Sequence, residues 1–213
     1  AKSELRTITY APTWEGEDEA NNYTSVDLYG PQIMQAALSV PDARVVYKPH
    51  PRVVASVDPV IRANHKLIVS LIAAAGAQHL YLPTADILGI LPETDLLIAD
   101  VSSVTLDHLY LAPDSPIVLT DRRSDSNQLH ADSPVSAACA VIDQSSITGI
   151  KNLIITSLDT DTHRSDRERM RSYYFSDTDQ ESSTGAFWSA ITTEIADHDA
   201  ALQGIQRVRQ VGS

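Results

Sequence analysis

Short runs of β-branched and apolar residues alternate with longer stretches of helical spacing along most of the chain. The expected strands are residues 7–10, 44–47, 79–82, 96–99, 116–119 and 138–142. The run 96–99 is apolar throughout, which is typical of a central strand in a parallel sheet. The helices expected between the strands cover residues 27–39, 59–75, 86–91 and 103–111, and a further helix over 145–157 follows the last strand. This alternation predicts an α/β fold, a Rossmann-like parallel sheet flanked by helices.

The last part of the chain is more polar. We expect residues 159–183 to be mostly loop, with a short helical stretch near 167–174, and residues 184–210 to form one or two closing helices. The predicted domains are a Rossmann-like domain over residues 1–198 and a helical tail over 199–213. Because the chain has no initiator Met and enters a strand at once, we interpret it as a fragment of a longer protein.

The charge of the chain argues against several classes of partner. Its 28 acidic and 16 basic side chains give a formal net charge of −12. This balance disfavours nucleic acid, since phosphate backbones attract clustered Lys and Arg, and it disfavours general attraction to an anionic membrane. Any phosphate-bearing ligand must therefore be held by specific donors.

The single cysteine, Cys139, lies in an apolar run typical of a core position, and a reducing interior is the simplest compartment.

The residues after each expected strand form the candidate site, because parallel sheets bind ligands at the carboxyl ends of their strands. Asp100-Val-Ser-Ser103 follows the apolar strand 96–99. Ser102 and Ser103 place hydroxyls and free backbone N–H groups at the positive end of a helix, which makes an anion site. The same serines are also typical N-caps, and one residue can serve both purposes.

A rigid histidine follows the second expected strand. In Lys48-Pro-His-Pro51 both prolines restrict the backbone, so His50 is held in an extended turn. Its ring can donate to a phosphate or move a proton near neutral pH. The alternative, a histidine that only closes a loop, stays equally open.

Three further positions carry weaker signals. Asp107 lies one helical turn after Ser103, where a carboxylate can accept from ribose hydroxyls, or can simply face solvent. Arg122, after the fifth expected strand, can reach a diphosphate or remain solvated. Residues 182–185, Ser-Ser-Thr-Gly, predict a second serine-rich helix start, with the same choice between an anion site and a cap. No zinc-ligand spacing, GxGxxG or P-loop sequence occurs.

Taken together, these pieces resemble the CDP-glycerol:poly(glycerophosphate) glycerophosphotransferase family over about residues 6–195. The matching segments are Tyr10-Ala-Pro-Thr-Trp14, Lys48-Pro-His-Pro51, Leu97-Ile-Ala-Asp-Val-Ser-Ser-Val104 followed by Asp107, Pro116-Ile-Val-Leu119, and the closing Tyr173-Tyr-Phe-Ser-Asp177 with Ser182-Ser-Thr184. The Asp-x-Ser-Ser element is the most specific. The resemblance implies a GT-B transferase, two Rossmann-like domains facing across a cleft, of which this chain is the C-terminal, donor-nucleotide-binding half.

The resemblance also implies a reaction and roles for individual residues. An acceptor hydroxyl attacks the β-phosphorus of a CDP-activated donor such as CDP-glycerol, and CMP is released. His50 is the catalytic residue beside the transferring phosphate. The implied diphosphate ligands are Ser102, Ser103, Ser183, Thr184 and Arg122. Asp107 binds the ribose, and the base is bordered by Leu82, Pro83 and Thr84. No metal or other cofactor is expected.

The implied partners extend beyond this chain. The acceptor, a cell-wall polymer or lipid-linked molecule, binds through an N-terminal domain that is absent here together with a second catalytic histidine, so the isolated domain is expected to be inactive. The resemblance places the full-length protein in the cytoplasm, peripheral on the inner face of the cell membrane. The loop 122–134 departs from the family's aromatic, acidic pattern, which leaves glycerol, ribitol and a sugar phosphate open. A GT-B enzyme that uses a UDP-sugar and a non-catalytic scaffold remain the alternatives.

Overall fold

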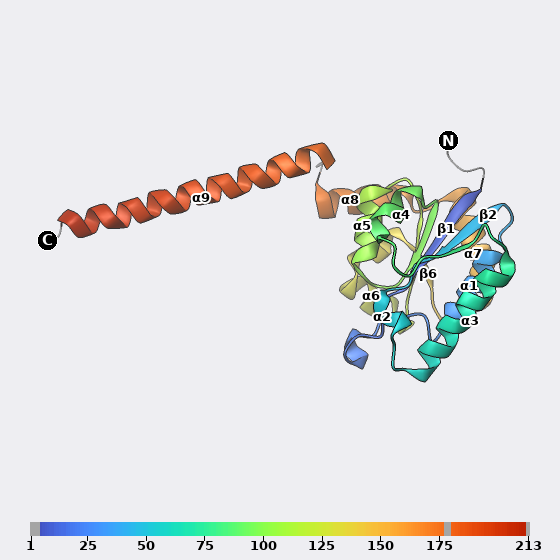
Figure 1. Cartoon of the computed structure of the whole chain (residues 1–213). Helices are drawn as coiled ribbons and strands as arrows, with labels where there is room; N and C mark the ends of the chain where they lie inside the picture. The colour runs from blue at the N-terminus through green and yellow to red at the C-terminus, as the bar shows by residue number, and fades with distance from the viewer. Residues whose placement is uncertain (1–4, 177–179, 212–213) are drawn as a thin grey trace. The chain divides into compact units, whose positions relative to one another are not determined.

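The computed structural model describes residues 5–176 and 180–211 (Figure 1). The chain divides into two compact units, Ala1–Tyr174 and Phe175–Ser213, which are described separately. The first unit contains the whole sheet and all the candidate site residues discussed above except those in 182–185. The second unit consists mainly of one long helix.

A six-stranded, fully parallel sheet forms the centre of the first unit, in the order β3-β2-β1-β4-β5-β6. The strands are β1 Arg6–Ala11, β2 Ala43–Tyr47, β3 Leu80–Tyr81, β4 Leu96–Ala99, β5 Ile117–Thr120 and β6 Ala140–Ile142. The strand order reverses between β1 and β4, since β2 and β3 are added on one side of this pair and β5 and β6 on the other, and Ala11 pairs with Ala99 there. Crossover segments leave these two strands toward opposite sides, which opens a crevice at their carboxyl ends.

Helices cover both faces of the sheet (Figure 1). Their bounds are α1 Gly30–Leu38, α2 Pro51–Val54, α3 Pro59–Ala75, α4 Ile87–Ile90, α5 Ser103–Leu111, α6 Ser126–Asp132, α7 Ile150–Thr160 and α8 Arg164–Phe175. Helix α1 packs against α3 and α7 on one face, while α4 and α5 pack together on the other. Short 3₁₀ turns lie at Glu19–Asn21, Leu91–Glu93, Pro134–Ala138 and Ile147–Gly149.

The main hydrophobic core lies between the sheet and the face that carries α1 and α3. Alternate side chains of the central strands point into it, including Ile8 and Tyr10 of β1 and Ile98 of β4, all fully buried. Ile33 and Ile68 meet them from α1 and α3. Because side chains of a strand alternate between faces, this pattern fixes the register of each strand.

The structure confirms the predicted Rossmann-like α/β fold and differs from the sequence prediction mainly in the later segments. The predicted helix 145–157 is a 3₁₀ turn followed by α7. The short helical stretch expected near residues 167–174 is confirmed as the longer helix α8, whose Arg167 is fully buried. Helix α6 was not predicted, and its N-terminus is capped by the side chain of Asp125.

In the second unit, α9 runs as one helix over Gln180–Val211. The domain boundary predicted at 198/199 falls inside this helix, and the compact unit that holds the sheet ends at Tyr174. Residues 182–185, predicted as a helix start, lie within α9, because the helix begins at Gln180. Asp177, at the end of a family-like segment, is outside the described residues. Among the described helices, none is long and apolar enough to cross a membrane.

Candidate active site

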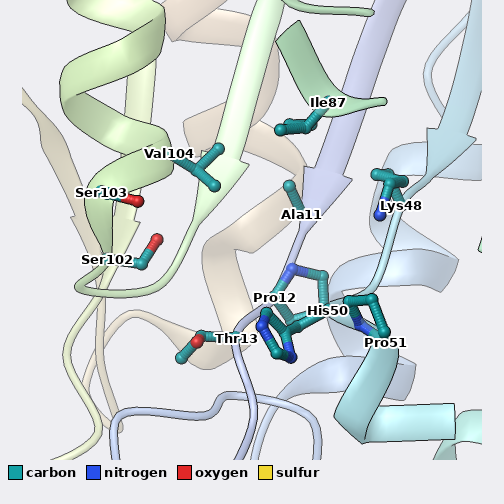
Figure 2. A pocket seen from close by; sticks show the side chains of 10 residues that line it. All are labelled: Ala11, Pro12, Thr13, Lys48, His50, Pro51, Ile87, Ser102, Ser103 and Val104. Atoms are coloured by element: carbon teal, nitrogen blue, oxygen red, sulfur yellow. The ribbon is translucent and has the colours of Figure 1, made fainter. Parts of the chain in front are cut away.

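A cavity of about 280 Å³ lies at the carboxyl edge of the sheet, where β1 and β4 diverge (Figure 2). Its walls come from four segments: the residues after β1 and β2, the first residue of α4, and the turn that leads from β4 into α5. The lining residues are Ala11, Pro12, Thr13, Lys48, His50, Pro51, Ile87, Ser102, Ser103 and Val104. The fold therefore joins the two motifs that the sequence singled out, His50 and the serine pair, in one cavity.

Asp100, the first residue of the turn that contains the serine pair, links the segments at the carboxyl edge of the sheet through hydrogen bonds. Its carboxylate is fully buried and accepts from the backbone N–H of Thr13 at 2.8 Å, that of Ser25 at 3.2 Å and the hydroxyl of Thr120 at 2.7 Å. Burial raises the pKa of Asp100 to about 6, against the lowering effect of these hydrogen bonds. Asp100 thus positions the cavity wall at Thr13 and does not itself line the cavity.

The serine pair begins α5. Ser102 occupies the N-cap position with an extended backbone, yet its side chain makes no capping hydrogen bond. Its Oγ is buried and has no hydrogen-bond partner among the described residues. Figure 2 shows Ser102 and Ser103 side by side on the cavity wall at the start of α5. Because the first backbone N–H groups of a helix lack intrahelical acceptors, this corner presents several donors and a positive dipole to a ligand. The same two serines also border a second cavity of about 200 Å³.

His50 caps the short helix α2 and stands at the opposite wall of the cavity (Figure 2). Its backbone N–H donates to the carbonyl of Pro12 at 2.9 Å, and its Nδ1 accepts from the backbone N–H of Arg52 at 3.2 Å. A neutral His50 therefore carries its proton on Nε2. Desolvation, followed by the positive charges of Lys48 and Arg52, lowers the pKa of His50, so the neutral form prevails at pH 7.

The indole of Trp14 supports the His50 loop. It stacks on the imidazole with ring centroids 6.3 Å apart and planes inclined by 26°. The guanidinium of Arg52 lies 4.0 Å from the Trp14 ring centroid and pairs with Glu17. This arrangement ties the loop after β1 to the loop after β2, and so fixes both walls of the cavity on that side.

Lys48 was part of a quoted motif but was given no role by sequence reasoning. Its side chain lines the cavity, and the residue is only 8% exposed. The signal was present in the sequence, since a lysine directly after an apolar strand lies at the ligand-binding edge of the sheet. What the sequence could not show is that this lysine is buried. Thr13 was missed for a similar reason, because its place in the wall depends on Asp100.

Several predicted site residues do not line the cavity. Arg122 donates to both carboxylate oxygens of Asp27, at 2.6 and 2.7 Å, and to the carbonyl of Thr24 at 3.2 Å. Asp107 is half-buried on α5, and burial raises its pKa. Leu82, Pro83 and Thr84 lead from β3 toward α4, whose Ile87 reaches the cavity instead. Ser183 and Thr184 belong to the second unit and to the body of α9.

Among the described residues, neither the single cysteine nor any cluster of metal-ligating side chains adds to the candidate site. Cys139 is buried, its thiol donates to the carbonyl of Val135, and burial raises its pKa to about 12, so it is an inert core residue as predicted. In the part of the chain that the structure describes, no group of three or more His, Cys, Asp or Glu side chains is arranged to hold a metal ion.

Several solved structures resemble this fold at low sequence identity. An α,α-trehalose 6-phosphate synthase from Burkholderia multivorans is 10% identical with a TM-score of 0.57, over 93% of this chain and 44% of that one. A variant of the wall teichoic acid polymerase TagF is 16% identical with a TM-score of 0.51, over 92% and 45%. A putative UDP-N-acetylglucosamine 2-epimerase from Listeria monocytogenes is 14% identical with a TM-score of 0.50, over 83% and 46%.

These likenesses establish the fold, a Rossmann-like domain of the GT-B type, and this chain spans less than half the length of each structure. No curated protein sequence matches the chain. The model of one protein family, however, matches residues 2–184, which include the whole sheet and all four walls of the cavity. Because this match covers most of the chain, the chain belongs to the CDP-glycerol:poly(glycerophosphate) glycerophosphotransferase family.

Proposed function

We propose that this chain is the donor-binding part of a transferase that moves glycerol phosphate, or a related polyol phosphate, from a CDP-activated donor to a cell-wall polymer or lipid-linked acceptor. The observation that carries the proposal is the cavity that joins His50 to the N-terminus of α5. A diphosphate suits this cavity, because the helix end, the serine hydroxyls and Lys48 all favour negative charge. The chain as a whole carries a net charge of −12, so these groups attract an anion locally and not through the overall charge of the chain.

The proposed reaction is attack of an acceptor hydroxyl on the β-phosphorus of the donor, with departure of CMP. Charge on the phosphates must be stabilised as this happens, and donors fixed before the reaction do so most effectively. The backbone N–H of Arg52 occupies Nδ1 of His50, so a neutral His50 offers an Nε2–H donor to the transferring phosphate. The base that accepts the hydroxyl's proton then lies elsewhere, which agrees with an acceptor site on another domain. We place the reaction at the cytoplasmic face of the membrane.

A binding titration of the 213-residue chain tests the proposal. The ligands are CMP, CDP, CDP-glycerol, UDP and UDP-N-acetylglucosamine, and each is repeated with Ser103→Ala. We expect tighter binding of the cytidine nucleotides and about a tenfold loss with the variant, the usual value of one hydrogen bond to a charged group. Ser70→Ala, an exposed serine on α3, is the matched control.

The outcomes separate the candidate functions. A preference for uridine nucleotides would replace the CDP-polyol donor by a UDP-sugar. If none of the five ligands binds, the cavity is not a nucleotide site in this chain and the proposal fails. Equal affinities for Ser103→Ala and the wild-type chain would remove the Ser103 hydroxyl from the diphosphate site.

A further inference from the structure

Lys48 is held rigidly at the cavity. It directly follows β2, and its backbone N–H extends the sheet by donating to the carbonyl of Tyr10 at 2.9 Å. The residue is 8% exposed, and its side chain lines the cavity between Ile87 and His50 (Figure 2). An ordinary surface lysine is largely exposed, whereas most of this residue is covered by the protein around the cavity.

The charge of Lys48 has no carboxylate partner in the described part of the chain. Its ammonium donates to the carbonyl of Pro49 at 3.2 Å, and the structure records no ion pair for it there. Burial lowers the pKa of Lys48, and Asp86 opposes that effect only at longer range. A desolvated ammonium with one neutral acceptor is costly, because it has three N–H donors and an unbalanced charge. An anionic ligand in the cavity would supply both the acceptors and the countercharge.

The sheet order indicates which part of the ligand Lys48 meets. Strand β2 pairs with β3, and the backbone N–H of Leu82 donates to the carbonyl of Tyr47, so the segment 82–84 leaves the sheet beside Lys48. Residues 82–84 do not line the cavity itself, and the family resemblance places the cytosine base beside them, beyond the cavity end that Ile87 bounds. The N-terminus of α5 lies across the cavity. Lys48 therefore lies between the base and the serine pair, at the position of the phosphate nearer the nucleoside.

We propose that Lys48 is a catalytic residue whose ammonium binds the α-phosphate of the donor, the group that departs as CMP. The inference rests on the proposed function above. In the step, a bond forms between the acceptor oxygen and the β-phosphorus while the bond from that phosphorus to the bridging oxygen breaks. The electron pair of the broken bond stays on the bridging oxygen, which becomes a phosphate oxygen of CMP, and the hydroxyl proton passes to a base. Lys48 balances the negative charge gained by CMP.

A ligand series on the 213-residue chain tests this assignment. Cytidine, CMP, CDP and CDP-glycerol are titrated into the wild-type chain and into Lys48→Met, which keeps an unbranched apolar stem without the charge. We expect the affinities for CMP, CDP and CDP-glycerol to fall about 10- to 100-fold and the affinity for cytidine to stay unchanged. Lys48→Arg, which retains the charge, should recover most of the loss. Lys66→Met makes the same substitution at an exposed position of α3 and should change nothing.

Each other result overturns the inference in a recognisable way. An unchanged affinity for CMP with a weakened affinity for CDP would move Lys48 to the β-phosphate. An equal loss for cytidine would mean that Lys48 only supports the cavity wall. If the wild-type chain binds no cytidine nucleotide, the proposed function itself fails. Should circular dichroism show Lys48→Met to be unfolded, Lys48→Gln carries the same comparison.

Discussion

Lys48 beside the cavity and Arg167 of α8 are both buried cations, and they differ in how their charge is matched. Arg167 is fully buried, donates to both carboxylate oxygens of Asp161 at 2.6 and 2.7 Å, and reaches the carbonyls of Pro113 and Asp114. Lys48 has a single neutral acceptor, the carbonyl of Pro49. A buried charge that the protein balances itself serves the fold, whereas one left unbalanced at a cavity is available to a ligand.

The largest expected difference between the two cations is in their contribution to the free energy of unfolding. Arg167→Met leaves Asp161 and two carbonyls without their donors, so the free energy of unfolding should fall by about 3 kcal/mol. Lys48→Met removes an unbalanced charge and should change it by less than about 1 kcal/mol, or raise it. Denaturant titrations followed by circular dichroism measure both values. Arg169→Met, at an exposed ion pair with Asp166, is the control and should cost at most about 0.5 kcal/mol.

Comparable losses for Arg167→Met and Lys48→Met would break the contrast. They would mean that Lys48 contributes to the fold as Arg167 does, and that the imbalance seen at the cavity is offset elsewhere in the native state.

A second, smaller effect concerns Asp100, a buried anion at the cavity edge. Its pKa is raised from 3.8 to about 6, so between these values the native state binds a proton that the unfolded state has released. Its contribution to stability is therefore fully present below pH 3.8 and is lost as the pH rises through about 6. Asp100→Asn keeps the shape without titrating. From pH 7 down to pH 4, the wild-type chain should gain about 2 kcal/mol relative to this variant.

Thermal or denaturant unfolding at several pH values gives the required difference between the two proteins. Using the difference cancels the contributions of the other carboxyl groups, which are common to both. A wild-type advantage that instead grows with rising pH would mean that the hydrogen bonds from Thr13, Ser25 and Thr120 outweigh burial.

The smallest expected effect compares two helix starts. The side chain of Asp125 caps α6 by accepting from the backbone N–H groups of Asn127 and Gln128, both at 3.1 Å, so Asp125→Ala should cost about 1 kcal/mol of stability. Ser102 makes no such bond at the start of α5, so Ser102→Ala should leave stability within about 0.5 kcal/mol. Melting temperatures of the two variants check this. Equal destabilisation would identify Ser102 as an ordinary cap.

The parts of the fold that the sequence predicted well are those with local causes. Helix α3 was predicted with its observed bounds, because Pro59 begins it and Gly76 follows it. Strand β4 and helix α5 were also predicted with their observed bounds, since an apolar run leads directly into a serine turn. The site followed from the same logic, since the carboxyl ends of adjacent parallel strands must meet at one edge.

The parts that the sequence could not predict depend on partners distant in the chain. The sequence predicted a helical stretch near residues 167–174, but it could not show that Arg167 of this helix pairs with Asp161 and donates to the carbonyl of Pro113. Arg122 was a candidate diphosphate ligand, and the sequence could not show that its guanidinium pairs with Asp27 in the folded domain. The isolation of Lys48 from any carboxylate is likewise a property of the assembled edge. Local sequence gives these residues their charge, and tertiary structure decides whether that charge is balanced.

The hydrogen bond to Nδ1 of His50 has a consequence for how this site tolerates sequence drift. The donor is the main-chain N–H of Arg52, so the bond is independent of the side chain at that position. Any residue with a backbone N–H can keep His50 in its Nε2-protonated form, and proline alone among the twenty cannot. The proton position on the neighbouring imidazole therefore survives replacement of Arg52 by any residue except proline, whereas the contacts of the Arg52 guanidinium with Trp14 and Glu17 do not.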